Sequence, residues 1–318
     1  WAKELVKTAK ESGCKYITLT VRHHDGFSLY DTKGLSDFDV MHSACRRDLI
    51  KEFVDECNAQ GIMPVFYHTM LDWHCPKYKN DFPKYIDYLE KSLRLLCTNY
   101  GKIGGFWFDG TWDKTDVDWQ ENRLYGLIKE LQPEAMIINN SGLSALGKLG
   151  HDLLDGVTFE RGKPRCCVCE TKHVAGEMCQ VLNDHWGYAK DDCNYKSLKS
   201  LIEDLVDCRK YNCNFLLNTG LTGRGTIREI DKCIFLEIGK WIKANKGFIY
   251  SAKACDVTAE NADVLYDDNN YYAIIKNVGM SADPNVGLKN NLKSVKINTE
   301  GKIKNVKWLD NGKAVKTK

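Results

Sequence analysis

The residues best suited to chemistry lie at the end of an apolar run, where residues 104–110 read Gly-Gly-Phe-Trp-Phe-Asp-Gly. The run has the composition of a buried strand, and it ends in the carboxylate of Asp109. In parallel α/β folds the carboxyl ends of the strands carry the active site. We therefore expect Asp109 at the floor of a pocket beside Trp107, although an Asp that only begins a turn fits this motif equally well.

A second group of polar side chains, His23-His24-Asp25, follows another β-rich run. Two neighbouring histidines can donate hydrogen bonds to the hydroxyls of a ligand, or they can bind a metal ion. A metal site needs further ligands, which His68, His74 and Asp72 near the next predicted strand end could supply. The alternative is that both histidines only satisfy carbonyl groups of a turn.

Strand-like and helix-like segments alternate along most of the chain. β-rich apolar runs occupy residues 16–21, 63–68, 103–109, 135–139 and 213–218. Helical periodicity occupies residues 1–12, 47–59, 83–99, 119–131 and 227–245. Repeated βα units imply a parallel sheet. Polar residues at the ends of several strands favour a barrel over a doubly wound sheet, which often carries a Gly-rich phosphate loop that this sequence lacks.

The rest of the chain has a different pattern. Residues 141–195 show little periodicity, and we expect a long functional loop there. After Gly247 short alternating runs are separated by Asn, Asp and Gly, which predicts antiparallel strands with a hairpin turn at residues 311–312. The prediction is an α/β fold, a catalytic (β/α)8-like barrel over residues 1–247 followed by a small antiparallel β-sandwich over residues 248–318.

Composition and charge argue against several classes of partner. Lys and Arg number 45 against 43 Asp and Glu, so no electrostatic argument favours nucleic acid or an anionic membrane. No segment has the apolar length that spans a bilayer, and no signal peptide is visible. We expect a cytoplasmic protein, although a chain that begins with Trp1 leaves secretion open.

The chain has fourteen cysteines without regular spacing, and many of them lie inside apolar runs. We expect most of them to be reduced thiols that pack as small apolar side chains. The cluster Cys166, Cys167 and Cys169 could bind a soft metal or sense redox state. No Cys-x-x-Cys partner follows at zinc-finger spacing, so incidental loop cysteines are the preferred interpretation.

Six motifs, in order over about residues 1–250, resemble the α-L-fucosidases of glycoside hydrolase family 29. They are Arg22-His23-His24-Asp25-Gly26-Phe27, Arg47-Asp48-Leu49, Gly61-Ile62-Met63-Pro64-Val65-Phe66-Tyr67-His68 with Asp72-Trp73, Phe106-Trp107-Phe108-Asp109-Gly110, Trp186-Gly187-Tyr188 and Cys213-Asn214-Phe215-Leu216-Leu217-Asn218. The region after residue 250 is also similar to this family's C-terminal domain. The resemblance implies a retaining exo-α-L-fucosidase that removes terminal fucose from oligosaccharides or glycoconjugates without a cofactor or metal.

The resemblance also implies roles for individual residues. It makes Asp109 the nucleophile, and it assigns sugar binding to His23, His24, Tyr67 and Trp107. Glu160, in Thr158-Phe159-Glu160, resembles the acid/base motif and is favoured for that role. Glu177 is the alternative, since it matches a family motif in which a Trp usually precedes the Glu and Gly176 stands here instead.

Family members carry a further barrel strand upstream of the segment that begins this chain. We therefore expect an open barrel, and poor hydrolysis of aryl α-L-fucosides by this chain alone. Two other functions stay open from the sequence. One is an inactive relative that only binds fucose or another carbohydrate, and the other is a metal-dependent hydrolase built on His23, His24 and His68.

Overall fold

The main element of the fold is a parallel sheet of seven strands that pair in chain order from β1 to β7. The structure is a computed structural model that describes residues 1–167, 172–276, 295–299 and 303–317. The strands are β1 Tyr16–Arg22, β2 Met63–Thr69, β3 Gly105–Asp109, β4 Met136–Asn139, β5 Gly156–Thr158, β6 Ala175–Val181 and β7 Cys213–Asn218. The sheet curls so far that the Tyr16 hydroxyl on β1 donates to Glu177 on β6. The predicted α/β class with a parallel sheet is confirmed.

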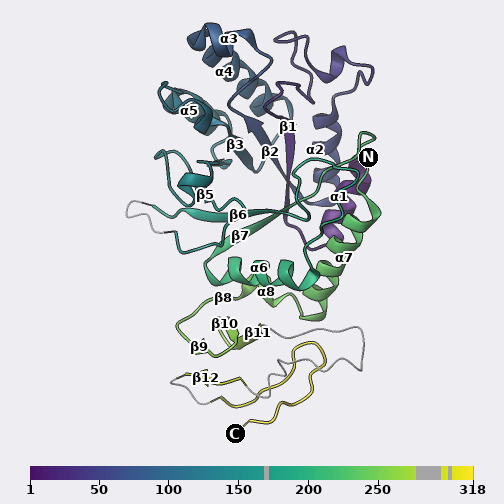
Figure 1. Ribbon diagram of the computed structural model, residues 1–318, viewed down its shortest axis with the longest axis vertical. Coiled ribbons are helices and arrows are strands. Elements are labelled where there is room, and N and C mark those ends of the chain that lie inside the picture. The colour runs from purple at the N-terminus through teal and green to yellow at the C-terminus, as the bar shows by residue number, and fades with distance from the viewer. Residues whose placement is uncertain (168–171, 277–294, 300–302, 318) are drawn as a thin grey trace.

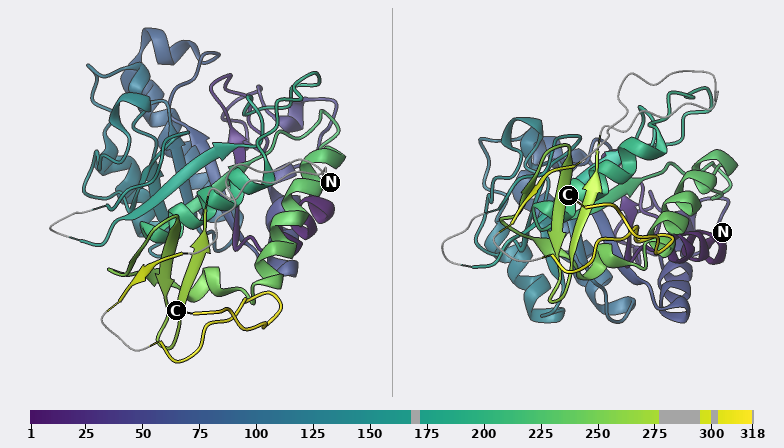
Figure 2. Two further views of the ribbon diagram at one scale, coloured as in Figure 1. Left: turned by 60° about the horizontal axis from the view of Figure 1, so that its bottom comes forward. Right: turned by 90° about the horizontal axis from the view of Figure 1, so that it is seen from below.

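Helices surround this curled sheet (Figure 1 and Figure 2). They are α1 Ala2–Glu11, α2 Leu49–Gln60, α3 Pro76–Asn80, α4 Phe82–Asn99, α5 Glu121–Leu131, α6 Leu198–Lys210, α7 Glu229–Ala244 and α8 Phe248–Ser251. Local signals set their ends: Asp48 caps α2 by accepting from the Lys51 backbone N–H at 2.9 Å, and Gly61 ends that helix in the left-handed conformation. The largest apolar cluster joins α1, α2, α4 and α5 to the first four strands.

Residues 141–195 differ from the single long loop that the sequence predicts, because β5 and β6 lie within them. β5 has only three residues, too few to show a period. β6 buries the polar side chains of Glu177 and Gln180, so it lacks the alternation of a strand with one solvated face. The sequence pattern also did not predict α6. Ser197 caps the start of this helix, since its side chain accepts a hydrogen bond from the Ser200 backbone N–H.

A second, antiparallel sheet lies below the parallel one in Figure 1 and packs against α6. Its strands are β8 Lys253–Ala254, β9 Thr258–Ala259, β10 Ala262–Tyr266, β11 Tyr271–Ile275 and β12 Ile297–Asn298. Leu265 of β10 is buried in one apolar cluster with Leu201 and Val206 of α6. The predicted turn at residues 311–312 is confirmed by the antiparallel bridge of Lys307 and Ala314. Within the described ranges, no helix is long and apolar enough to cross a bilayer.

The strand that carries Asp109 is held close to both of its neighbours. A Cβ on Gly105 would lie 2.2 Å from the carbonyl oxygen of Met136, so only glycine lets β3 approach β4 this closely. Gly110, with φ +98°, turns the chain directly after the strand. The register then sets Asp109 beside Thr69 at the carboxyl end of the sheet.

Candidate active site

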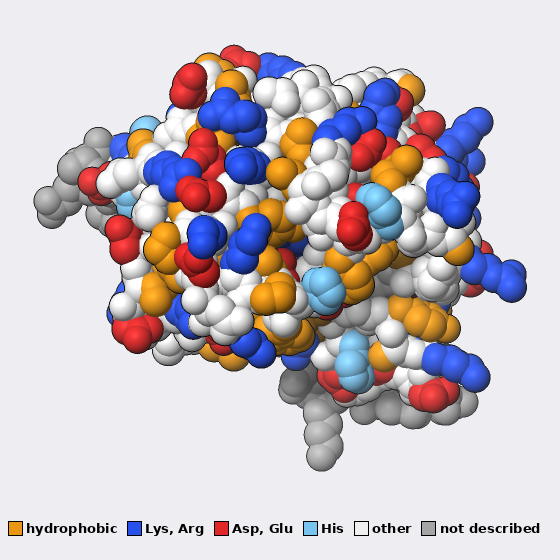
Figure 3. Space-filling model, turned by 90° about the horizontal axis from the view of Figure 1, so that it is seen from above, with side chains coloured by type: hydrophobic (Ala, Val, Ile, Leu, Met, Phe, Trp, Pro, Cys, Tyr) orange, Lys and Arg blue, Asp and Glu red, His pale blue; other side chains and the backbone are white. Residues whose placement is uncertain are grey.

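Four side chains surround the carboxylate of Asp109, which is 13% exposed. The Tyr67 hydroxyl donates to Oδ2 at 2.8 Å, and the Trp112 indole N–H donates to Oδ1 at 2.9 Å. The Asn140 amide reaches Oδ1 at 3.3 Å, and Nε2 of His24 lies 3.5 Å from Oδ2. Figure 3 shows the face seen from above, where hydrophobic and histidine side chains lie among Lys, Arg, Asp and Glu.

These donors decide the charge state of Asp109. Burial alone would raise the pKa of this carboxyl, but the hydrogen bonds from His24, Trp112 and Tyr67 outweigh it and hold the pKa below its ordinary value. The neighbouring Tyr67 has its pKa raised by burial and by the Asp109 charge, so its hydroxyl keeps its proton. The site therefore presents an ionised carboxylate at neutral pH.

Both predicted histidines belong to the group of side chains around Asp109 and Tyr67. Nδ1 of His24 lies 2.6 Å from the hydroxyl oxygen of Thr69. The Thr69 hydroxyl donates a hydrogen bond to the Leu71 carbonyl oxygen at 2.8 Å. Thr69 thus contacts one ring nitrogen of His24, and the other, Nε2, is turned toward Asp109. The His23 ring stacks on the Tyr67 ring with centroids 5.3 Å apart. The pKa of His23 is lowered, mainly by burial and to a smaller extent by the neighbouring His24.

Asn140 connects Asp109 to Glu160. One amide nitrogen, Nδ2 of Asn140, lies 3.3 Å from Asp109 Oδ1 and 2.7 Å from Glu160 Oε2. The Asn140 oxygen accepts from the hydroxyl of Thr158 on β5 at 2.9 Å, which fixes the orientation of the amide. Because Oδ1 of Asp109 and Oε2 of Glu160 both contact this one nitrogen, the distance between the two oxygens is at most about 6 Å.

Glu177, the other candidate, lies deeper in the structure and is 1% exposed. Its Oε1 accepts from the indole N–H of Trp107 at 2.8 Å, and its Oε2 accepts from the Tyr16 hydroxyl. Burial raises the pKa of Glu177 and outweighs both hydrogen bonds. Trp107 in turn stacks on Tyr67 with ring centroids 5.4 Å apart, so Glu177 lies behind Trp107 and is less exposed than Asp109.

The metal-site alternative fails on the position of His68. Adjacent residues of a strand point to opposite faces, so Tyr67 faces Asp109 while His68 faces the helices. His68 is fully buried, and its ring lies against Phe108. It therefore does not converge with His23 and His24. No group of three or more His, Cys, Asp or Glu side chains that could hold a metal ion occurs among the described residues.

A model of the family described as α-L-fucosidase matches residues 1–247. The chain belongs to the α-L-fucosidase family. It is 25% identical over 292 residues to the α-L-fucosidase of Dictyostelium discoideum, covering 86% of this chain and 62% of that protein. It is 28% identical over 276 residues to the tissue α-L-fucosidase of Mus musculus, covering 82% and 58%. The chain thus spans little more than half the length of these curated relatives.

Solved α-L-fucosidases share the fold. Isoenzyme 1 from Paenibacillus thiaminolyticus superposes with a TM-score of 0.84 at 31% identity, covering 100% of this chain and 78% of that one. The α-L-fucosidase AlfC from Lactobacillus casei, in complex with its α-L-fucose product, superposes with a TM-score of 0.64 at 26% identity, covering 77% and 80%. The suspected resemblance to α-L-fucosidases is confirmed.

Two side chains that contact Asp109 were not predicted as site residues from the sequence. Asn140 follows Asn139 at the end of a predicted strand, and this position could have marked it as a site residue. Trp112 follows Asp109 within a short 3₁₀ turn, Thr111–Asp113, and no pattern in the sequence marks it. Its contact with the carboxylate depends on the turn that Gly110 allows.

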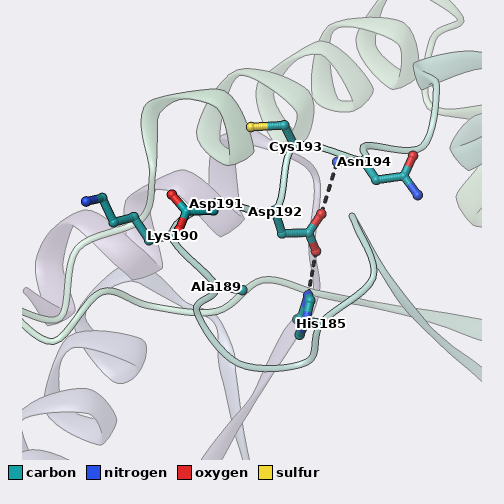
Figure 4. Close-up of a pocket in the computed structure, with 7 residues that line it drawn as sticks. All are labelled: His185, Ala189, Lys190, Asp191, Asp192, Cys193 and Asn194. Atoms are coloured by element: carbon teal, nitrogen blue, oxygen red, sulfur yellow. Dashed lines mark hydrogen bonds and ion pairs between the residues drawn. The ribbon is translucent and has the colours of Figure 1, made fainter.

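An open hollow of about 720 Å³ lies apart from these contacts, in the loop after β6 (Figure 4). Asp192 holds this loop together: its Oδ2 lies 2.7 Å from Nδ1 of His185, and its Oδ1 accepts from the backbone N–H of Asn194. The His185 contact is the main reason that the pKa of Asp192 falls to about 2. Both groups are already paired, so we interpret the pair as a structural clamp.

Of the predicted cysteine cluster, Cys167 has a partner from another part of the chain. Cys167 lies beside Cys213 of β7, and each Sγ is 3.6 Å from the carbonyl oxygen of Arg165. The hydrogen bond from Cys213, helped by Arg165, lowers the pKa of the Cys167 thiol. Cys169 lies outside the described residues. Cys213 was not part of the predicted cluster, because it lies 46 positions after Cys167 in the sequence.

Proposed function

We propose that this chain carries the catalytic site of a retaining exo-α-L-fucosidase, which hydrolyses terminal α-L-fucose from fucosylated oligosaccharides or glycoconjugates. Asp109 is the nucleophile and Glu160 is the acid/base. His23, His24, Tyr67 and Trp107 form the fucose pocket. Membership in the family and the likeness to a relative with α-L-fucose bound support this proposal.

The observation that carries the proposal is the Asn140 amide shared by two carboxylates. Retaining glycosidases hold their carboxyl groups roughly 5–5.5 Å apart, whereas inverting ones need about 6.5–9.5 Å to admit a water molecule. The limit of about 6 Å between Asp109 and Glu160 oxygens supports the retaining arrangement. Glu177 accepts a hydrogen bond from the Trp107 indole N–H and is therefore occupied, which favours Glu160 as the proton donor.

The reaction proceeds in two displacements. Asp109 attacks the anomeric carbon while Glu160 gives its proton to the glycosidic oxygen, so that the bond to the leaving alcohol breaks and a fucosyl ester forms. Glu160, now ionised, takes a proton from water, and the resulting hydroxyl attacks the same carbon. The ester bond breaks, fucose leaves with retained configuration, and both carboxyl groups return to their starting states.

Trapping with 2-deoxy-2-fluoro-α-L-fucosyl fluoride, followed by peptide mapping, tests the proposal. The fluorine at C2 slows hydrolysis of the ester, so we expect a stable label on the peptide that contains Asp109. Asp25→Asn, which changes an exposed carboxylate next to His24, is the matched control and should label as the wild type does. Label on another residue would refute the assignment, and fucose binding without label would indicate a protein that only binds the sugar.

We also propose the finer architecture predicted from the sequence, a (β/α)8-like barrel over residues 1–247 followed by a small β-sandwich over residues 248–318. The curl that brings Tyr16 of β1 to Glu177 of β6 supports a barrel. The change from parallel to antiparallel pairing after α8 supports the boundary. Separate expression of residues 1–247 tests it, and a cooperative unfolding transition is expected.

A further inference from the structure

Trp112 contacts the carboxylate of Asp109 and is also exposed to solvent. Its indole N–H donates to Oδ1 of Asp109 at 2.9 Å, yet the residue is 44% exposed. The His24 ring meets it edge-on with centroids 5.8 Å apart, and a Cβ on Gly142 would lie only 3.4 Å from it. The His24 contact and the hydrogen bond to Asp109 orient the ring, and a substantial part of the residue remains open to solvent.

The two oxygens of Asp109 face different sides of the site. His24 and Tyr67 approach Oδ2. Trp112 and Asn140 approach Oδ1, and the same Asn140 nitrogen bonds Glu160. In the proposed reaction Glu160 must lie beside the oxygen of the leaving group. The exposed ring of Trp112 therefore lies on the side of the site that the leaving group occupies.

We propose that Trp112 forms a leaving-group subsite, in which its exposed ring packs against the apolar face of the sugar or aryl group linked to fucose. This inference rests on the proposed function and deepens it. Aromatic rings bind the C–H faces of sugars and flat aryl groups by burying apolar area, and a preordered ring loses little entropy on contact. Trp112 then has two separable contributions: its N–H stabilises the nucleophile, and its ring binds the group that departs.

Two substrates and two substitutions separate these contributions. α-L-Fucosyl fluoride has a leaving group too small to reach a ring, whereas 4-nitrophenyl α-L-fucoside carries an aryl group. Trp112→Phe keeps a ring but removes the N–H, so it should lower kcat/KM for both substrates by a similar factor. Trp112→Ala also removes the ring, and we expect a further loss of roughly tenfold for the aryl fucoside only, the size of one lost aromatic contact.

Trp73→Ala is the matched control, because Trp73 is 61% exposed and its ring lies 5.6 Å from that of His24. It should leave the ratio of the two kcat/KM values unchanged. Trp112→Leu keeps apolar bulk and gives the same comparison if the alanine variant does not fold. Equal loss for both substrates in Trp112→Ala, or an equal change of the ratio in Trp73→Ala, would overturn the subsite. A wild-type protein that hydrolyses neither substrate would instead refute the proposed function on which the subsite rests.

Discussion

The hydroxyl of Tyr67 lies 2.8 Å from Oδ2 of Asp109 and donates a hydrogen bond to it. The phenol ring is itself fixed between two others, stacking on His23 at 5.3 Å and on Trp107 at 5.4 Å between centroids. Because the ring cannot turn away, the hydroxyl is a permanent donor to the carboxylate. It helps to keep Asp109 ionised in a site whose burial would otherwise favour the protonated form.

Removing this donor should change the pH dependence of the proposed fucoside hydrolysis. In Tyr67→Phe the ionised form of Asp109 loses one hydrogen bond, so its pKa rises and the acidic limb of the kcat/KM profile moves to higher pH. We also expect kcat/KM near neutral pH to fall roughly 10–100-fold, the usual effect of one charge-assisted hydrogen bond. Tyr100→Phe, which removes a hydroxyl that donates to Asp48 instead, is the control. An acidic limb that stays in place would contradict the role given to Tyr67.

The two glutamates can be distinguished with azide. Glu160→Ala should lower the hydrolysis of natural fucosides far more than that of aryl fucosides, whose leaving groups need little protonation. Azide can then attack the fucosyl ester without general base help, so we expect faster turnover and formation of fucosyl azide with retained configuration. Glu177→Ala should show neither effect, since that side chain binds Trp107 and Tyr16. Azide rescue of Glu177→Ala and not of Glu160→Ala would reverse the assignment.

The shared amide makes Asn140 a sensitive position. Asn140→Ala removes the donor that Asp109 and Glu160 share, so the two side chains lose the group that positions them relative to each other. We expect a loss of about 10²–10³ in kcat, comparable to losing one well-placed donor in an active site. Asn139→Ala is the neighbouring control: its amide bonds Tyr125 and Thr111, on the other side of the strand end. Similar kcat losses in both variants would point to a general effect of the strand end.

The sequence indicated residues that lie together in the structure better than it indicated the strands around them. Asp109, His23, His24, Tyr67 and Trp107 were chosen from contiguous motifs, and the structure brings them together. Strand β5 was not found because it has only three residues, and β6 was not found because a curled parallel sheet can bury polar side chains on its inner face, which hides the usual alternation. The contacts of Trp112 and Asn140 depend on how loops that follow different strands meet in space. A local sequence pattern cannot predict such contacts.

Glu177 should make the stability of the protein depend on pH in a direction opposite to that of Asp109. Burial raises the pKa of Glu177 in the folded state, so the folded chain binds this proton more tightly than the unfolded chain does. Stability from this group is therefore fully present at low pH, and it falls as the pH rises from the unfolded pKa toward the raised folded one. For Asp109, whose folded pKa is lowered, stability falls as the pH decreases.

Glu177→Gln tests this directly. The amide can accept from Trp107 and donate to the oxygen of Tyr16, and it carries no charge at any pH. The free energy of unfolding of the variant, measured with urea between pH 4 and pH 8, should therefore improve relative to the wild type as the pH rises. Glu130→Gln, on the exposed side of α5, controls for the loss of one carboxylate. Glu177→Ala leaves two buried donors without an acceptor and should cost about 2–5 kcal/mol. A constant difference between Glu177→Gln and the wild type would show that Glu177 titrates alike in both states.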